Sequence, residues 1–198
     1  MTRQPLPSKT KHRRIKPTVI ILGDGKTEES YINRLKELDY FNQINLKFEQ
    51  GDEFSFETKI KEHAFKEKKV IIIIDIDNAQ TNSRKYNQIK KLFETKKYKN
   101  QIFFNNYAFE LWLINHYKKC GKPILDKKGY DSEMEEIFKV SSWSDYKNEN
   151  NRKKVMDKID CQSIDNAVKN INELNQKNPF KNPSSNMDEW VRTINKIK

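Results

Sequence analysis

The sequence is poor in the residues on which several protein classes depend. Its only two cysteines, Cys120 and Cys161, lack a neighbouring cysteine or paired histidine, which excludes a disulfide framework and a zinc knuckle. No apolar run approaches the roughly 20 residues that a membrane-spanning helix needs, and residues 1–16 carry basic side chains without an apolar signal core. We therefore expect a reduced, cytoplasmic protein that does not enter a membrane.

The composition is nevertheless that of a folded protein with a heavily charged surface. Hydrophobic residues make up 35% and charged residues 34% of the 198-residue chain, which also contains three Trp, eight Tyr and eleven Phe. Such an aromatic content is too high for a disordered chain, and this length suits one core with an appendage. We predict a flexible basic arm at 1–16, an α/β core at 17–120 and a helical C-terminal part packed on it at 121–198.

The net charge is strongly positive. Lysine and arginine total 39 against 28 acidic residues, a formal charge of +11 that attracts phosphate-rich partners. Lysine is far commoner than arginine and is accompanied by much Asn and Ile, which is also the bias of an AT-rich genome. The charge alone therefore leaves both origins open, and the basic arm is either a solubilising tail or a phosphate contact.

Apolar strand-like segments alternate with helical patterns along the first half of the chain, which predicts a parallel four-stranded sheet flanked by helices. The predicted strands are residues 17–22, 44–49, 70–75 and 101–104. Helical spacing predicts one helix through Tyr31, Leu35 and Leu38 and another at 80–97. Three amphipathic stretches, at about 131–139, 149–159 and 163–175, predict a helical C-terminal extension.

The segment IILGDGKTEES at 20–30 joins the first strand to a helix through an acid between two glycines. It has neither the ending of a P-loop nor the third glycine of a dinucleotide site, so Asp24 suits phosphate only through a metal ion. Glu28 is either a catalytic group or a first-turn acid favoured by the helix dipole, with Thr27 as N-cap. Lys26 either neutralises charge on a substrate or is simply solvated.

Two more acids, Asp75 and Asp77, follow the most apolar strand in IIIIDIDNA at 71–79. Residues two apart in a strand point the same way, and open α/β sheets bind ligands at the carboxyl ends of their strands. Paired carboxylates suit Mg²⁺ or Mn²⁺, although an isolated pair also suits a strand end or helix cap. Together with Asp24, the pair predicts a metal site at this edge.

Two further segments resemble a known family. NNYAFELWLINHY at 105–117 resembles the Asn-Pro-x-Phe-Glu-x-Trp-x-x-x-His segment of the RloB-like family, and KNPSSNMDEW at 181–190 resembles its Asn-Pro-Ser-Thr segment. The resemblance runs from about residue 17 to the end. It implies a Toprim domain and a nuclease of bacterial phage defence that works beside an ABC/SMC-like or AAA ATPase. Related Toprim effectors cleave transfer RNA.

The resemblance adds site residues, each with a structural alternative. Glu110 is a metal ligand, a base or a helix-end charge. His116 lies on the apolar face of its helix and is either catalytic or a hydrogen-bonded core histidine. Asn182 and Ser184 either contact the substrate backbone or shape a turn.

The sequence also departs from the family pattern. Asp24 stands where the family usually has Glu, which puts catalytic competence in question. Tyr107 replaces a proline, and we expect Asn106 to cap the following helix. Ser185 and Asp188 resemble a capping box before a last helix.

These observations predict a Mg²⁺- or Mn²⁺-dependent phosphodiester hydrolase. Asp24, Asp75 and Asp77 would hold the ion, and Glu28 or Glu110 would accept a proton from its bound water. RNA, transfer RNA in particular, is preferred to DNA as substrate. The alternative is a degenerate Toprim module that binds nucleic acid or docks onto an ATPase without cutting, and the shorter Asp24 is the feature that favours it.

Overall fold

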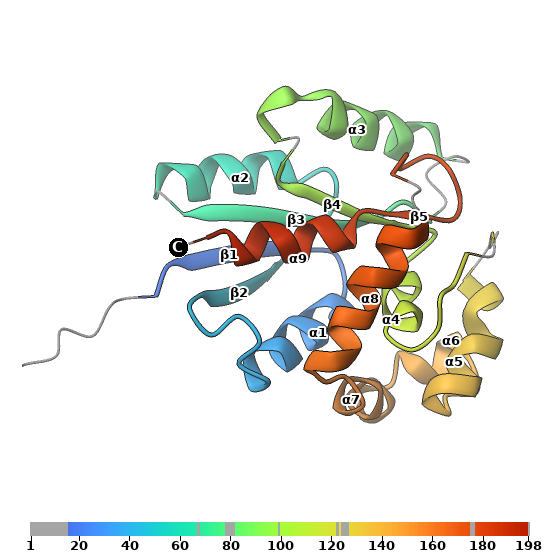
Figure 1. Ribbon diagram of the computed structural model, residues 1–198. Coiled ribbons are helices and arrows are strands. Elements are labelled where there is room, and N and C mark those ends of the chain that lie inside the picture. Colours follow the sequence, from blue (N-terminus) through green and yellow to red (C-terminus); the bar gives the residue numbers. More distant parts are fainter. Residues whose placement is uncertain are drawn as a thin grey trace, which may run out of the picture.

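The computed structural model describes residues 16–197 except 67, 78–81, 99, 122, 124–126 and 175–176. It has three layers, with helices on both faces of a central sheet (Figure 1). Of the predicted basic arm, only Lys16 belongs to the described residues.

The sheet has the strand order β2-β1-β3-β4-β5. Its strands are β1 Thr18–Gly23, β2 Asn45–Gln50, β3 Lys69–Asp75, β4 Ile102–Asn106 and β5 Ser184–Ser185. The first four are parallel and confirm the predicted sheet, and each lies within one or two residues of its predicted position. The two-residue β5 was not predicted, and it pairs antiparallel with the end of β4.

Helices connect the parallel strands and then form the C-terminal part. The first group is α1 Lys26–Glu37, α2 Phe56–Phe65, α3 Ser83–Glu94 and α4 Glu110–Asn115, with a short 3₁₀ turn at Lys96–Tyr98. The second is α5 Asp131–Phe138, α6 Trp143–Tyr146, α7 Glu149–Asp157, α8 Cys161–Leu174 and α9 Met187–Asn195, preceded by a 3₁₀ turn at Lys127–Tyr130. Within the described part of the chain, no helix is both long and apolar enough to span a membrane.

Strand β3 is buried on both faces, as its unbroken β-branched run predicts. Ile72 and Ile74 pack in a core with α2 and α3, whereas Ile71 and Ile73 pack in a second, larger core with α1 and α4. Successive side chains therefore join opposite layers, which follows from the pleat of the strand.

The larger core joins early and late parts of the chain. Tyr31 from α1, Trp112 from α4, Ile164 from α8 and Trp190 from α9 are all fully buried in it. The helices after residue 120 thus pack directly on the sheet and its first helix. The predicted domain boundary at residue 120 stays a prediction.

The expected cap of α4 is wrong. Asn106 is the last residue of β4, and its Nδ2 donates a hydrogen bond to the Pro179 carbonyl at 2.9 Å. The helix begins only at Glu110. Asn106 is drawn into the strand by its pairing with Ser184 of β5, an interaction that local sequence does not reveal.

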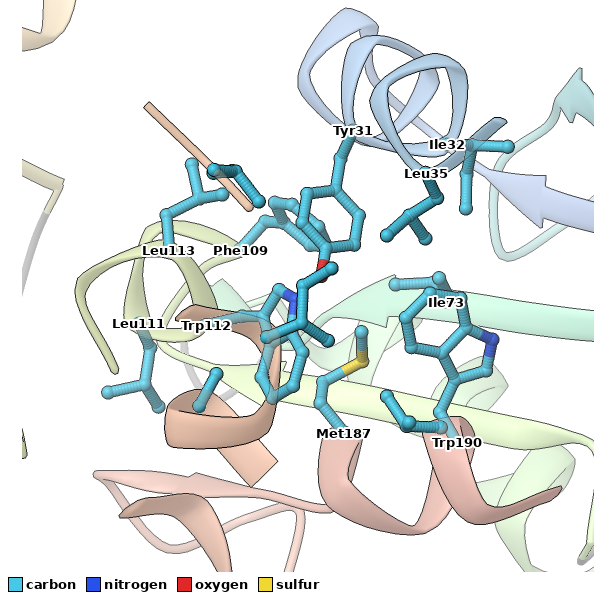
Figure 2. Packing of buried hydrophobic residues seen from close by; sticks show 14 of the residues in the cluster. Tyr31, Ile32, Leu35, Ile73, Phe109, Leu111, Trp112, Leu113, Met187 and Trp190 are labelled. Atoms are coloured by element: carbon cyan, nitrogen blue, oxygen red, sulfur yellow. The ribbon is translucent and has the colours of Figure 1, made fainter. Parts of the chain in front are cut away.

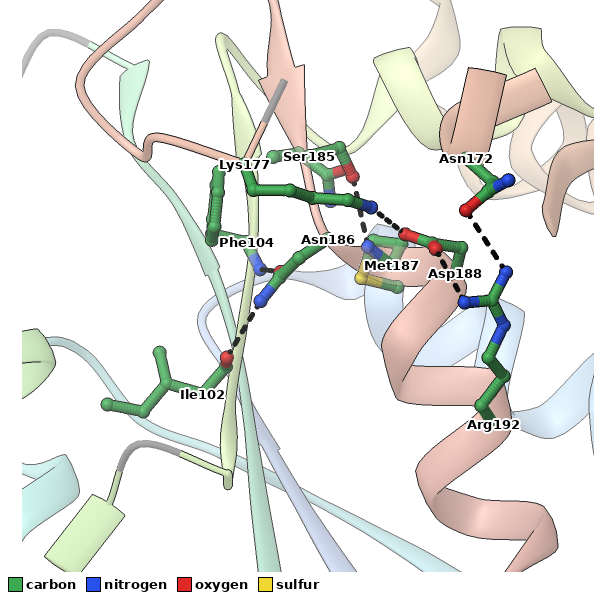
Figure 3. Close-up of polar contacts among 10 residues, drawn as sticks. Ile102, Phe104, Asn172, Lys177, Ser185, Asn186, Met187, Asp188 and Arg192 are labelled. Atoms are coloured by element: carbon green, nitrogen blue, oxygen red, sulfur yellow. Dashed lines mark hydrogen bonds and ion pairs between the residues drawn. The ribbon is translucent and has the colours of Figure 1, made fainter. Parts of the chain in front are cut away.

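The start of α9 is tied to β4 (Figure 3). Ser185 Oγ accepts a hydrogen bond from Met187 N at 3.2 Å, as a capping residue would. Asp188 does not complete the predicted capping box, because it forms ion pairs with Lys177 and Arg192. Beside it, the Asn186 side chain accepts a hydrogen bond from Phe104 N at 2.7 Å and donates one to the Ile102 carbonyl at 3.2 Å.

Candidate functional site

A cavity of about 410 Å³ lies at the carboxyl ends of β1 and β3. We call it the acidic pocket, and its lining residues are Asp24, Gly25, Lys26, Thr27, Glu28, Gln50, Asp75, Phe109, Glu110, Lys147 and Arg152. It brings together four of the six acids and histidines predicted to be catalytic.

Parallel strand ends position the first two acids. Asp24 directly follows β1 and Asp75 is the last residue of β3, and these two strands are hydrogen-bonded neighbours. Gln50 ends β2 on the other side of β1, and its Nε2 donates a hydrogen bond to the Asp24 carbonyl at 3.0 Å. Asp75 is 7% exposed, so its carboxylate is largely shielded from solvent.

Helix starts position the other two acids. Glu28 and Glu110 lie in the first turns of α1 and α4, where the helix dipole favours negative charge, and both are buried. The N-cap of α1 is Gly25, not Thr27. A Cβ atom at Gly25 would lie 2.5 Å from Glu28 Oε2, so the absence of a side chain there makes room for the Glu28 carboxylate.

Two buried phenols accompany these carboxylates. Burial raises the pKa of Tyr146, and the charges of Glu110 and Glu28 raise it further. Burial also raises the pKa of Tyr130, with smaller contributions in the same direction from Glu110 and Asp75. Both hydroxyls therefore remain neutral at physiological pH and add no charge to the pocket.

Three cations share the lining with the acids. Lys26 forms an ion pair with Glu29 at 2.8 Å, and Arg152 Nη1 donates a hydrogen bond to the Lys147 carbonyl. Lys147 and Arg152 come from the α6–α7 segment, which follows the sheet in sequence. Four carboxylates against three cations give the lining a formal charge of −1.

Asp77 does not line the acidic pocket. Strand β3 ends at Asp75, and Asp77 has a φ of 30°, so the alternation that would place both side chains on one side does not continue. Its carboxylate pairs instead with Lys85 Nζ at 2.9 Å. Burial lowers the pKa of Lys85, but the hydrogen bond and charge of Asp77 outweigh this effect and leave the pKa raised.

His116 lies in the core rather than in the pocket. It belongs to an aromatic cluster of Tyr31, Phe109, Trp112, His116 and Trp190, whose rings meet mostly edge to face. Figure 2 shows the other four members converging from α1, α4 and α9. The cluster fills the space between these helices.

Both ring nitrogens of His116 have protein partners. Nδ1 donates to the Trp112 carbonyl at 2.9 Å, so Nε2 accepts the hydrogen bond from the Tyr31 hydroxyl at 3.1 Å. Burial lowers the pKa of His116 to about 4. Of the two readings of this histidine, the geometry matches the hydrogen-bonded core residue.

The predicted substrate-binding residues of the C-terminal segment also lie elsewhere. Ser184 is fully buried in β5, and Asn182 precedes it across a cis peptide bond to Pro183. Neither lines the acidic pocket, whereas Lys26 does.

The pocket supplies the right kind of ligand for a hard divalent ion. Carboxylate and amide oxygens, which Asp24, Glu28, Asp75, Glu110 and Gln50 offer, suit Mg²⁺ or Mn²⁺. As the side chains stand, no three His, Cys, Asp or Glu residues in the described ranges form a metal-binding group. The donor chemistry fits, and the carboxylates would have to converge on an ion.

Three pocket residues were not predicted from the sequence. Gln50 had a usable signal, because it ends a strand parallel to those that carry Asp24 and Asp75. Lys147 and Arg152 had none, because α6 and α7 reach the pocket only through tertiary packing.

Comparison with known proteins gives one match. The family model described as RloB-like protein matches residues 19–194, nearly the whole chain. No curated protein and no solved structure matches the chain. The match includes the residues of the acidic pocket as well as both segments that carry the resemblance, and the chain belongs to the RloB-like family.

Proposed function

We propose that the chain is a metal-dependent nuclease of the Toprim type that cleaves a phosphodiester bond in RNA. The observation that carries the proposal is the acidic pocket, where four carboxylates from two strand ends and two helix starts line one cavity with three cations. A structural role alone does not account for this set, because gathering like charges in a buried place costs free energy unless a counter-charge compensates.

The roles follow from position. Asp24 and Asp75, at neighbouring strand ends, would hold Mg²⁺ or Mn²⁺ together with one of the two glutamates. A bound ion of this kind polarises a phosphoryl oxygen and lowers the pKa of a bound water. The other glutamate, Glu28 or Glu110, accepts the proton of the attacking water. Asp77, engaged with Lys85, has no part in this assignment.

The substrate and partner rest on charge and on the family. The formal charge of +11 suits a polyanion. The resemblance to Toprim effectors favours RNA, and transfer RNA within it, over DNA. The same resemblance supports a role in phage defence beside an ABC/SMC-like or AAA ATPase.

The test is incubation of the purified protein with total RNA and, separately, with DNA, in Mn²⁺, Mg²⁺ or EDTA. We expect RNA cleavage that needs the divalent ion and disappears in Asp75→Ala. Asp157→Ala is the matched control, because it removes an exposed carboxylate on α7 outside the pocket. Equal cleavage by Asp75→Ala and the wild-type protein, both folded, would exclude the proposal.

A degenerate module that binds nucleic acid or docks onto an ATPase is the second candidate. Two observations favour it: the shorter Asp24 in place of the usual Glu, and the lack of a ready-made group of three metal ligands among the described residues. The variant Asp24→Glu separates the candidates. A nuclease with a fully competent Asp24 gains nothing from the change, whereas cleavage that appears only in Asp24→Glu, or in no variant even with the partner present, supports the degenerate module.

A further inference from the structure

We propose that Lys147 and Arg152 form the phosphate-binding side of the acidic pocket and hold the nucleic-acid backbone against the carboxylates. This inference rests on the proposed function and deepens it, because it assigns substrate binding to the α6–α7 segment. The family motifs and the predicted site residues do not include either side chain.

The first support is placement. Both cations line the cavity that Asp24, Asp75 and Glu110 line, although they follow these residues in the C-terminal part of the chain. A phosphodiester bound at the carboxylates would therefore meet a cationic wall on the α7 side of the pocket. Charges of opposite kind on two sides of one cavity suit a metal ion on one side and a phosphate on the other.

The second support is that α7 is anchored to α1, the helix that carries Glu28. Arg34 of α1 donates hydrogen bonds from Nε to the Ile159 carbonyl at 3.0 Å and from Nη2 to the Asp157 carbonyl at 3.3 Å. Val155 and Met156 are buried in the larger core. The start of α7, where Arg152 lies, is thereby held in a defined place relative to the carboxylates.

The third support is the state of the Arg152 guanidinium. Its Nη1 is engaged by the Lys147 carbonyl, which orients the group. Its Nε is buried with no hydrogen-bond partner among the described residues, and no ion pair of Arg152 is found within the same ranges. Arginine presents five donors in a planar fork that matches phosphate oxygens, so this half-buried cation retains donors for a ligand.

The charge of the pocket sets the order of binding. The lining carries a formal charge of −1, so a phosphodiester anion entering it alone is repelled. A divalent cation changes the sign of the lining to positive and removes this repulsion. The two cations therefore bind the backbone effectively only after the metal is present.

The experiment measures RNA binding rather than cleavage. A short fluorescein-labelled single-stranded RNA is titrated with the full chain in Ca²⁺ or in EDTA, and fluorescence anisotropy gives the affinity over a series of salt concentrations. The double variant Lys147→Gln/Arg152→Gln is compared with Lys153→Gln/Lys154→Gln. The control pair lies on α7, is exposed, loses the same charge and does not line the pocket.

We expect the salt slope of log affinity to fall by about two in the pocket variant, about one for each lost phosphate contact, and by clearly less in the control. Arg152→Lys, which keeps the charge, retains the wild-type slope. Binding of the wild-type protein is tighter in Ca²⁺ than in EDTA. Thermal unfolding of each variant shows that the comparison is made on folded protein, and the single variant Lys147→Gln replaces the double variant if the latter is unstable.

Equal slopes in the pocket and control variants overturn the inference, as does wild-type binding that is no tighter in Ca²⁺ than in EDTA. The result also separates the two proposals. RNA binding that depends on Lys147 and Arg152 without any cleavage contradicts the nuclease and leaves the binding site in place. Metal-dependent cleavage with unchanged binding by the pocket variant contradicts the binding site and leaves the nuclease.

Discussion

The acidic pocket and the aromatic cluster are built by the same two helices and have opposite characters. Helix α1 contributes Glu28 to the pocket and Tyr31 to the cluster, and α4 contributes Glu110 to the pocket and Trp112 to the cluster. In each helix the first-turn residue meets the strand ends, and the residue one turn or less further on packs into the core.

Burial alone does not distinguish the two regions. Glu110 is 1% exposed and His116 is 0% exposed, yet only Glu110 borders a cavity. Both nitrogens of His116 are hydrogen-bonded within the core, so it has no atom to offer a substrate. A buried ionisable residue therefore suggests a functional site only when its polar atoms face a space that a ligand can enter.

The largest expected effect is the loss of packing in the aromatic cluster. Trp112 is fully buried, and Trp112→Ala should lower the free energy of unfolding by about 3–5 kcal/mol, because the deletion leaves a large cavity. Urea unfolding followed by circular dichroism measures it. The control is Phe65→Ala, whose ring is 91% exposed; its effect should stay within about 0.5 kcal/mol. Equal losses would contradict the assignment of the cluster.

The second prediction compares two residues of one helix region in the cleavage assay. Glu110→Gln should lower the cleavage rate by about a hundredfold or more, as expected for loss of a metal ligand or proton acceptor. His116→Gln, with folded protein equalised, should lower it by less than about tenfold, because His116 has no contact with the pocket. A loss in folded His116→Gln as large as that in Glu110→Gln would return His116 to the catalytic set.

The third prediction concerns pH. The pKa of His116 is about 4 in the folded chain against 6.5 in the unfolded chain, so the unfolded state binds the extra proton first and stability falls as the pH drops from 6.5 towards 4. Between pH 7.5 and 5, wild-type protein should lose about 2 kcal/mol more than His116→Gln does. Urea unfolding at both pH values measures the difference, and parallel losses in the two proteins would refute the neutral, buried histidine.

The smallest expected effect separates Asp77 from Asp75. Asp77→Asn leaves Lys85 charged without its partner and should cost about 1 kcal/mol of unfolding free energy. A double-mutant cycle of Asp77→Asn with Lys85→Gln should give a coupling energy of about that size, whereas the cycle of Asp75→Asn with Lys85→Gln should give almost none. Coupling of Lys85 to Asp75 instead would show that both acids share one site.

Much of the fold could be predicted because its signals are local. The apolar runs of β1 and β3 and the alternation in β2 define strands without reference to the rest of the chain. Since parallel strands align their carboxyl ends at one edge, Asp24 and Asp75 could be expected to meet there. Two of the three predicted metal ligands follow from this rule alone.

The misplaced residues depend on contacts that local sequence does not encode. Asp77 was assigned by extending the strand alternation past the point where β3 ends. Asn106 was assigned to a cap because the pairing with β5, which is remote in sequence, was not foreseen. His116 was left with two readings because an apolar helix face leads either to a core or to a buried site.

The sequence by itself determined the alternating sheet and helices, the position of two acids at neighbouring strand ends and the membership of a family. These properties depend on residue periodicity and on the direction of each strand. Only the tertiary structure decided that Glu28 and Glu110 join Asp24 and Asp75 while Asp77 and His116 do not, and that Lys147 and Arg152 complete the lining. The reason is that the packing of α4, α6 and α7 against α1 and the sheet sets which side chains share the cavity.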